Sequence, residues 1–273
     1  MKEVTPERKK THQPEKDHTS PKLIRHHVIG QICTNGEPLD NVRVTVAGKT
    51  ARSDKKGIFK LDFQAEKHRE YLVHASKPGF FTGSRIIAAN HPLKCSKVQI
   101  DLIDRSPIAS FDNAHGAKIQ HDGVTLIFNP WDVVDANGCP IKGRVNVAIK
   151  RIDPTTELGR QQMPGNLVGK SKRNDIVDLV SYVMMAVGLT DTEGNIMKTM
   201  RAMTMAIEVP ESLQESAPDE IPLWVFNDAI RKWQEENTAI LLDTKYAGGI
   251  KLDELPFWNC DTMMVRQIRE KSQ

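Results

Sequence analysis

The chain has 273 residues, of which 39% are hydrophobic and 27% are charged, so it is long enough for two domains and too hydrophobic to be disordered throughout. The formal net charge is +3, and residues 1–25 carry that excess with seven Lys or Arg against four acidic residues. The neutral remainder argues against a nucleic-acid partner, because nucleic-acid-binding proteins concentrate cations on one face. No run of 18 apolar residues is present, so we expect no membrane span.

Residues 1–25 are expected to form a disordered basic tail. They contain three prolines and many charges, and they show no apolar periodicity. The first residues carry charges without an apolar segment, so we expect no signal peptide in this chain. A cytoplasmic location therefore stays open.

Short strand-like segments fill residues 26–103. Residues 42–46 and 59–63 alternate apolar and polar side chains, which is typical of half-buried strands. The Asn35-Gly36 pair favours a tight hairpin turn. Strands separated by turn signals at short intervals indicate a β-sandwich.

A second series of strands is expected over residues 108–262, after a short linker. Alternation recurs at 124–128 and 145–149, and residues 222–226 and 232–234 are expected to be the arms of a hairpin. We expect a long loop at 154–177 and a tail at 263–273. Only residues 211–216 and the last dozen residues are candidates for helix. The predicted fold class is all-β, with two tandem β-sandwich domains after a disordered basic N-terminal tail.

Four cysteines are present, at positions 33, 95, 139 and 260, and none belongs to a CxxC motif. A zinc site of the finger type is therefore unsupported. The pairings Cys33–Cys95 and Cys139–Cys260 would each stay within one domain. The low cysteine density favours free thiols instead.

A set of ordered segments in the first domain points to a family. They are residues 30–32 (Gly-Gln-Ile), 38–44 (Pro-Leu-Asp-Asn-Val-Arg-Val), 53–59 (Ser-Asp-Lys-Lys-Gly-Ile-Phe), 71–73 (Tyr-Leu-Val) and 77–80 (Lys-Pro-Gly-Phe). This pattern resembles the carboxypeptidase regulatory-like (transthyretin-like) β-sandwich over about residues 27–103. The resemblance implies a rigid accessory module that carries no catalysis itself.

A further set of segments lies in the second domain. They are residues 123–130 (Gly-Val-Thr-Leu-Ile-Phe-Asn-Pro), 163–165 (Met-Pro-Gly), 222–226 (Pro-Leu-Trp-Val-Phe) and 257–261 (Phe-Trp-Asn-Cys-Asp). They resemble the β-sandwich that follows such modules in cartilage intermediate layer protein and related bacterial surface proteins. Relatives carry glycine where Arg231 stands here. The resemblance implies an extracellular or cell-surface protein with an adhesion, scaffolding or accessory role.

Exposed aromatic side chains are the candidate ligand-binding residues, because a planar ring can stack on a sugar. We select Trp131, which follows Pro130 in a predicted loop, together with Tyr182. The other three tryptophans, at positions 224, 233 and 258, alternate with polar residues in predicted strands, so they are expected in the core.

His115, His121 and Asp122 are the best metal candidates, although their spacing matches no established site and favours surface histidines. We expect no cofactor. Calcium is the alternative, because turns at 132–137 and 191–195 supply carboxylate oxygens, but neither matches an EF-hand loop.

No catalytic residue is assigned. Ser53 and Lys56 fit the S-x-x-K motif of penicillin-binding proteins, but they lie in a predicted turn and lack the partner motifs. The sequence predicts a non-enzymatic structural or interaction module with a protein or glycan partner. A carbohydrate-binding protein is the alternative, and a metal-dependent hydrolase is the third hypothesis.

Overall fold

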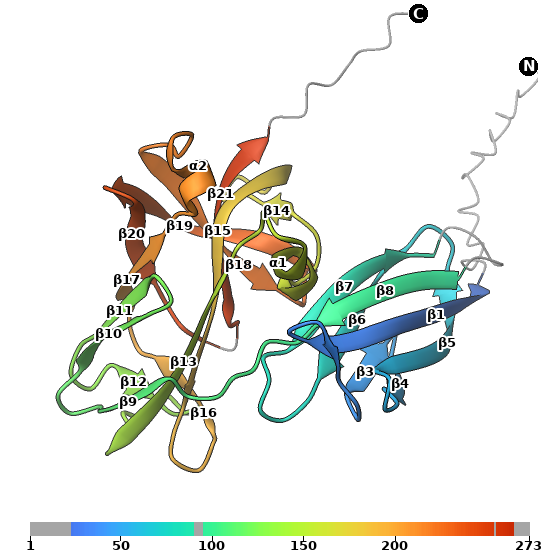
Figure 1. Cartoon of the computed structure of the whole chain (residues 1–273), viewed down its shortest axis with the longest axis horizontal. Coiled ribbons are helices and arrows are strands. Elements are labelled where there is room, and N and C mark those ends of the chain that lie inside the picture. The colour runs from blue at the N-terminus through green and yellow to red at the C-terminus, as the bar shows by residue number, and fades with distance from the viewer. Residues whose placement is uncertain (1–22, 90–94, 254, 265–273) are drawn as a thin grey trace, which may run out of the picture.

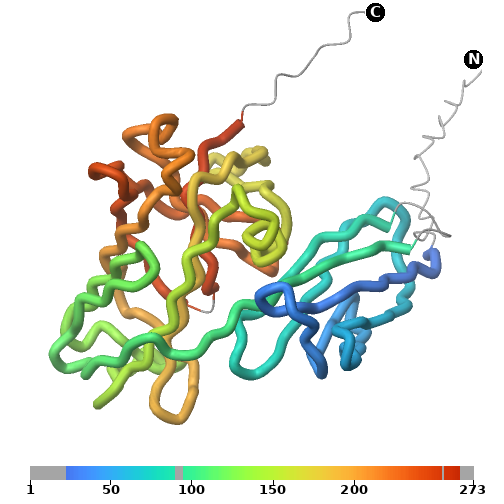
Figure 2. The backbone as a smooth tube through the Cα atoms, in the orientation of Figure 1, coloured from blue at the N-terminus to red at the C-terminus, as the bar shows by residue number. Residues whose placement is uncertain are grey.

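The computed structural model describes residues 23–89, 95–253 and 255–264 (Figure 1). Strands make up about 59% of it and helices about 4%, which confirms the all-β fold class. Among the described residues, no helix has the length and apolar character needed to cross a membrane. The chain forms two regions side by side, and Figure 2 shows one extended segment joining them between β8 and β9.

Among the described residues, the first region contains eight strands. They are β1 (Leu23–Thr34), β2 (Glu37–Pro38), β3 (Arg43–Val46), β4 (Lys49–Arg52), β5 (Ile58–Glu66), β6 (Glu70–Ser76), β7 (Gly83–Ala88) and β8 (Cys95–Asp101). In one sheet β1 pairs with β2, β5 and β8, and the other sheet has the order β4-β3-β6-β7. Alternate apolar side chains from both sheets meet in a single core, as in a sandwich.

Strand β1 begins at Leu23, so the expected disordered tail over residues 1–25 is wrong for its last three residues. Ile24 is buried and pairs with Ala65 of β5. The alternation of exposed and buried side chains therefore extends to the start of the strand. Residues 1–22 lie outside the described residues.

Two glycine-dependent features explain parts of the sequence pattern. Asn35 and Gly36 both have positive φ and connect β1 to β2, as the Asn-Gly pair predicted. Gly30 lies between β5 and β8 in the central strand. A Cβ there would approach Phe59 and Val98 to 2.5 Å, so the position excludes any side chain.

In the part of the second region that the structure describes, there are thirteen strands and two short helices. They are β9 (Ala109–Asp112), β10 (Ala117–His121), β11 (Val124–Phe128), β12 (Val133–Val134), β13 (Arg144–Ile152), α1 (Glu157–Gln162), β14 (Val168–Lys170), β15 (Ile176–Thr190), β16 (Ile196–Thr199), β17 (Met203–Glu208), α2 (Glu211–Gln214), β18 (Glu220–Asn227), β19 (Lys232–Leu242), β20 (Lys245–Ile250) and β21 (Phe257–Met264). The hairpin of β18 and β19 is confirmed, and α2 falls within the predicted helix at 211–216.

Three expectations for this region were wrong. Residues 154–177 hold α1 and β14 rather than an uninterrupted loop. The Thr156 hydroxyl accepts a bond from the Gly159 N–H and caps α1, and packing against β8 supports this short helix. Strand β21 continues to Met264, which pairs with Asp178, so the tail does not begin at 263 and residues 262–264 are not helical.

Hydrogen bonds join the second region into one continuous sheet, where two separate sheets were expected. The path runs β10-β11-β17-β20-β19-β18-β21-β15-β13-β9, and its two end strands contact each other, so the sheet is rolled up. Register shifts between Ser181 and Val183 and between Leu223 and Trp224 bend the long strands. Such bends let one strand serve two layers.

A buried apolar cluster joins the two regions, and we call it the junction cluster. It consists of Phe81, Ile103, Ala148, Ile152, Leu179, Met184, Ala186, Trp224, Phe226, Trp233 and Phe257. Phe81 and Ile103 come from the first region and its exit, and the others come from the outer face of the rolled sheet. The rings of Phe81 and Phe257 lie 6.2 Å apart. Side chains on the outer face of the sheet are therefore buried where the first region contacts it.

Polar contacts surround the junction cluster. Arg85 of β7 donates to the carbonyls of Met163 and of Arg160, the latter at 2.7 Å, and so satisfies the carboxyl end of α1. Burial lowers the pKa of Arg85 to about 10, which still leaves it a cation at neutral pH. The Gln162 side chain donates to the buried carboxylate of Asp101 at 3.1 Å.

Candidate functional site

Three loops of the second region converge near β9, β12 and β16, at the lower end of this region in Figure 1. They are residues 112–116, 129–132 and 200–201, and we call their shared surface the Trp131 platform. The loops follow strand ends, so their positions are set by the rolled sheet. They contact one another through buried polar groups rather than through a large apolar cluster.

Asn113 holds two of these loops together. Its fully buried amide donates 2.9 Å bonds to the carbonyls of Val133 and Ile141, and its Oδ1 accepts from the Val133 N–H at 3.1 Å. The Trp131 N–H donates to the Asn113 carbonyl at 2.7 Å. Buried amides that satisfy backbone groups in this way fix a loop in one conformation.

Asp132 holds the third loop. Its carboxylate is only 1% exposed, and it accepts bonds of 2.9 and 2.7 Å from the Arg201 guanidinium and of 2.9 Å from the Asn129 amide. The Asp132 carbonyl also accepts from the Met200 N–H at 2.7 Å. Arg201 remains mostly exposed, with 68% of its side chain accessible. The platform therefore presents a cation beside the tryptophan loop.

Trp131 is exposed, as the sequence predicted, at 45% of its surface. Its φ of 62° lies in the left-handed region, which is strained for a bulky side chain by roughly 1–3 kcal/mol. Such strain persists where the surroundings enforce it, and it is concentrated at functional sites. The platform thus displays an exposed aromatic side chain on a strained backbone that hydrogen bonds hold in one conformation.

The structure separates the candidate metal ligands. His115 precedes β10, while His121 and Asp122 lie at the other end of this strand, roughly 20 Å away at the usual rise of a strand. Asp122 accepts from the Arg151 N–H at 3.2 Å. Within the described ranges, no three or more His, Cys, Asp or Glu side chains gather as a metal site.

His115 instead lies on the platform. A Cβ on the adjacent Gly116 would clash with the Phe128 carbonyl and approach the Pro130 nitrogen to 3.0 Å, so the loops that carry His115 and Trp131 are packed together. Both side chains are exposed. The sequence selected both residues but assigned them to different sites.

Tyr182 does not join Trp131. Its hydroxyl donates to the Ser216 carbonyl at 3.0 Å, just beyond α2, and its ring packs edge-on against Tyr246. Figure 1 places α2 at the opposite end of the second region from β12. The two aromatic candidates therefore cannot contact one small ligand together.

The acidic turns are satisfied by their own backbone. Asp191 Oδ1 accepts from the N–H groups of Glu193 and Asn195 at 2.9 and 2.8 Å. Burial opposes ionisation of Asp191, but these bonds and one from the Asn195 amide outweigh it and lower the pKa. Asp135 makes the same kind of turn with Asn137 and Cys139.

The serine of the S-x-x-K motif is held by backbone groups. Ser53 lies between β4 and β5, and its hydroxyl donates to the Leu39 carbonyl at 2.8 Å and accepts from the Val42 N–H at 2.9 Å. All four cysteines are free thiols. Cys33 and Cys95 lie six register positions apart along the pair of β1 and β8, which excludes a bond between them.

No protein-family model matches this chain, and a search of curated proteins gives no match. Three solved structures show remote likeness. A protein of Bacteroides fragilis, described as membrane-associated and of unknown function, is 9% identical with a TM-score of 0.25, over 90% of this chain and 100% of its own. The shaft pilin SpaA of Lactobacillus rhamnosus GG is 10% identical with a TM-score of 0.23, over 72% and 89%. The major pilin BcpA of Bacillus cereus is 10% identical with a TM-score of 0.24, over 89% and 96%. Likeness at this level carries no argument about function.

Proposed function

We propose that this chain is a non-catalytic interaction module in which two β-domains are joined rigidly to present binding loops to a protein or glycan partner. The junction cluster carries this proposal. Domains that share only a small polar contact usually move relative to one another, whereas a buried apolar junction holds them in one arrangement. Here Phe81 of the first region packs against Phe257 and lies beside Gly188 of the second region, and both rings are only 3% exposed.

The ionisable groups with strongly shifted pKa values also support a structural role. Burial raises the pKa of Asp261 and of Cys260 well above their ordinary values, and both lie in the core of β21. A substrate would have no access to either group there. The resemblance of the segments at 123–130, 222–226 and 257–261 to cartilage intermediate layer protein and related bacterial surface proteins adds the proposal that the module works outside the cell.

Opening the junction tests the rigid arrangement. Phe81→Ala removes the ring that bridges the two regions, and we expect small-angle scattering to show a broader distance distribution than for the native chain. Phe63→Ala is the matched control, because Phe63 is equally buried but lies within the core of the first region. A native chain that scatters as two independently moving bodies would overturn the proposal. Turnover in a hydrolase panel would overturn its non-catalytic part.

A specific observation favours carbohydrate as the ligand of the Trp131 platform. An exposed indole can stack on the apolar face of a sugar, and the backbone of Trp131 is held by the bond from its N–H to the Asn113 carbonyl. The remaining N–H groups of Arg201 and the ring of His115 supply polar contacts beside it. Preorganisation of this kind reduces the entropic cost of binding.

Glycan-array binding tests this candidate. Trp131→Ala is expected to abolish binding, whereas Trp131→Phe should retain part of it because a flat ring remains. Tyr182→Phe is the control and should bind normally, since the Tyr182 hydroxyl is bound to Ser216. Binding that survives Trp131→Ala would reject the platform as the sugar site.

A further inference from the structure

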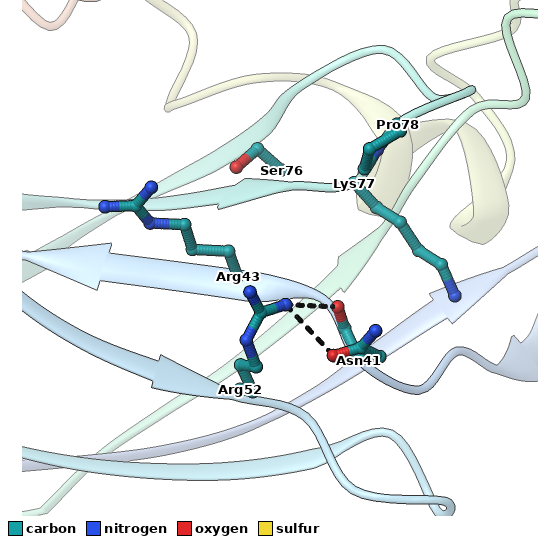
Figure 3. Close-up of a pocket in the computed structure, with 6 residues that line it drawn as sticks. All are labelled: Asn41, Arg43, Arg52, Ser76, Lys77 and Pro78. Atoms are coloured by element: carbon teal, nitrogen blue, oxygen red, sulfur yellow. Dashed lines mark hydrogen bonds between the residues drawn. The ribbon is translucent and has the colours of Figure 1, made fainter.

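A second surface, in the first region, has a different chemistry. A cavity of about 740 Å³ opens where β3, β4 and the end of β6 meet (Figure 3). The side chains that line it are Asn41, Arg43, Arg52, Ser76, Lys77 and Pro78. Three of the six are cations, and none is acidic. The volume of the cavity is that of a small-molecule site and is larger than a bare inorganic ion needs.

The register of the sheet brings two of these cations together. Arg43 of β3 is directly opposite Arg52 of β4, and Ser76 of β6 is directly opposite Arg43 on the other side. Like charges at directly opposite positions of an antiparallel pair destabilise a sheet. Figure 3 shows the two guanidinium groups turned apart. No acidic side chain among the residues that line the cavity offsets the charges of Arg43 and Arg52.

Two of the cations are oriented by neighbouring groups. One guanidinium nitrogen of Arg52 donates to Asn41 twice, to the carbonyl at 3.2 Å and to the side-chain oxygen at 2.9 Å. Its other N–H groups remain available to a ligand. Lys77 donates to the carbonyl of Asp40 at 2.8 Å and to its carboxylate at 3.2 Å. Arg52 and Lys77 are thus positioned before any ligand arrives.

We propose that this cavity binds a phosphate or sulfate monoester group carried by a small molecule. Guanidinium groups present parallel N–H donors that match the oxygens of such tetrahedral anions, and Lys adds a point charge. An anion bound at this pair would also offset the repulsion between the two positive charges. The remaining volume of the cavity accommodates the body of the molecule that carries the ester. This site is separate from the Trp131 platform and does not depend on it.

Calorimetric titration of the full chain tests the site. The probes are inorganic phosphate, inorganic sulfate, glucose 6-phosphate and glucose 6-sulfate, and comparison of the two esters identifies the preferred anion. We expect an ester to bind more tightly than its inorganic anion, and binding to weaken as salt increases. Arg43→Gln should weaken ester binding on the order of tenfold, the usual effect of losing one charged hydrogen bond.

Arg25→Gln is the matched control. Arg25 lies on β1, in the other sheet, and pairs with Asp62, so its replacement removes the same charge without touching the cavity. Ester binding should be unchanged in this variant. Without ligand, Arg43→Gln should raise the urea midpoint, because it removes the repulsion between Arg43 and Arg52. A midpoint at or above the native value would show that the variant folds. Equal loss of binding in both variants, or no binding of any probe at millimolar concentration, would overturn the proposal.

Discussion

The two regions of the molecule bury their strands in different ways. In the first region each sheet covers the core with one face, so Phe59, Leu61 and Phe63 are buried while Lys60 and Asp62 between them are exposed. In the second region β15 is covered on both faces, and residues 183–186 are all 0–1% exposed. The pattern of a strand therefore reports how many of its faces are covered.

The largest expected effect comes from removing one buried aromatic side chain in each region. Trp233→Ala and Phe59→Ala should each lower the free energy of unfolding by about 3–5 kcal/mol, because a cavity replaces a fully buried ring. Hydrogen exchange should distinguish them. Trp233 lies in the junction cluster, so its loss should also reduce protection around Phe81, whereas the effect of Phe59→Ala should stay within the first region. If Trp233→Ala and Phe59→Ala reduced protection of the same amides, the proposed difference in burial between the two regions would be wrong.

A smaller effect is expected from a buried carboxyl group of the second region. Asp261 is fully buried in β21, where it accepts from the Asn259 amide at 2.6 Å. Burial raises its pKa well above the ordinary value, and the contact with Ser181 opposes this shift only in part. The protonated form therefore stabilises the fold. Its contribution is fully present below the unfolded pKa of about 3.9 and is lost as the pH rises through the folded pKa.

Asp261→Asn should remove this dependence, because the amide is neutral at every pH. We expect the urea midpoint of the native chain to fall relative to that of the variant as the pH rises from about 4 toward 8. Asp253→Asn is the control, since Asp253 is exposed, and it should follow the native profile. Parallel profiles for the native chain and Asp261→Asn would show that Asp261 does not titrate in this way.

The sequence predicted the features that depend on local pattern. Alternation at 42–46 and 59–63 located β3 and β5 of the first region, and Asn35-Gly36 located a hairpin turn, whereas β4 and β7 were not predicted. The sequence did not predict the rolled sheet of the second region, because the bulge after Ser181 and the pairing of strands distant in the chain leave no local signal. The same holds for α1, which depends on its packing against β8.

The candidate sites also depend on contacts between segments that are distant in the chain. An exposed Trp131 followed from its place after Pro130, but its positive φ and the buried amide of Asn113 depend on contacts between loops. The opposition of Arg43 and Arg52 depends on the register of β3 and β4, which the alternation of side chains alone does not specify.

The smallest expected effect concerns the polar rim between the regions. Arg231 lies in the β18–β19 hairpin at a φ of 56°, and it donates to the Glu70 carbonyl of the first region at 2.7 Å. Arg231→Ala removes the hydrogen bond but keeps the strain, whereas Arg231→Gly removes both. We expect the glycine variant to be more stable than the alanine variant by about 1 kcal/mol in urea denaturation. The alanine variant should lose no more than about 1 kcal/mol relative to the native chain. A loss as large as that of Trp233→Ala would mean that the polar rim, rather than the junction cluster, holds the two regions together.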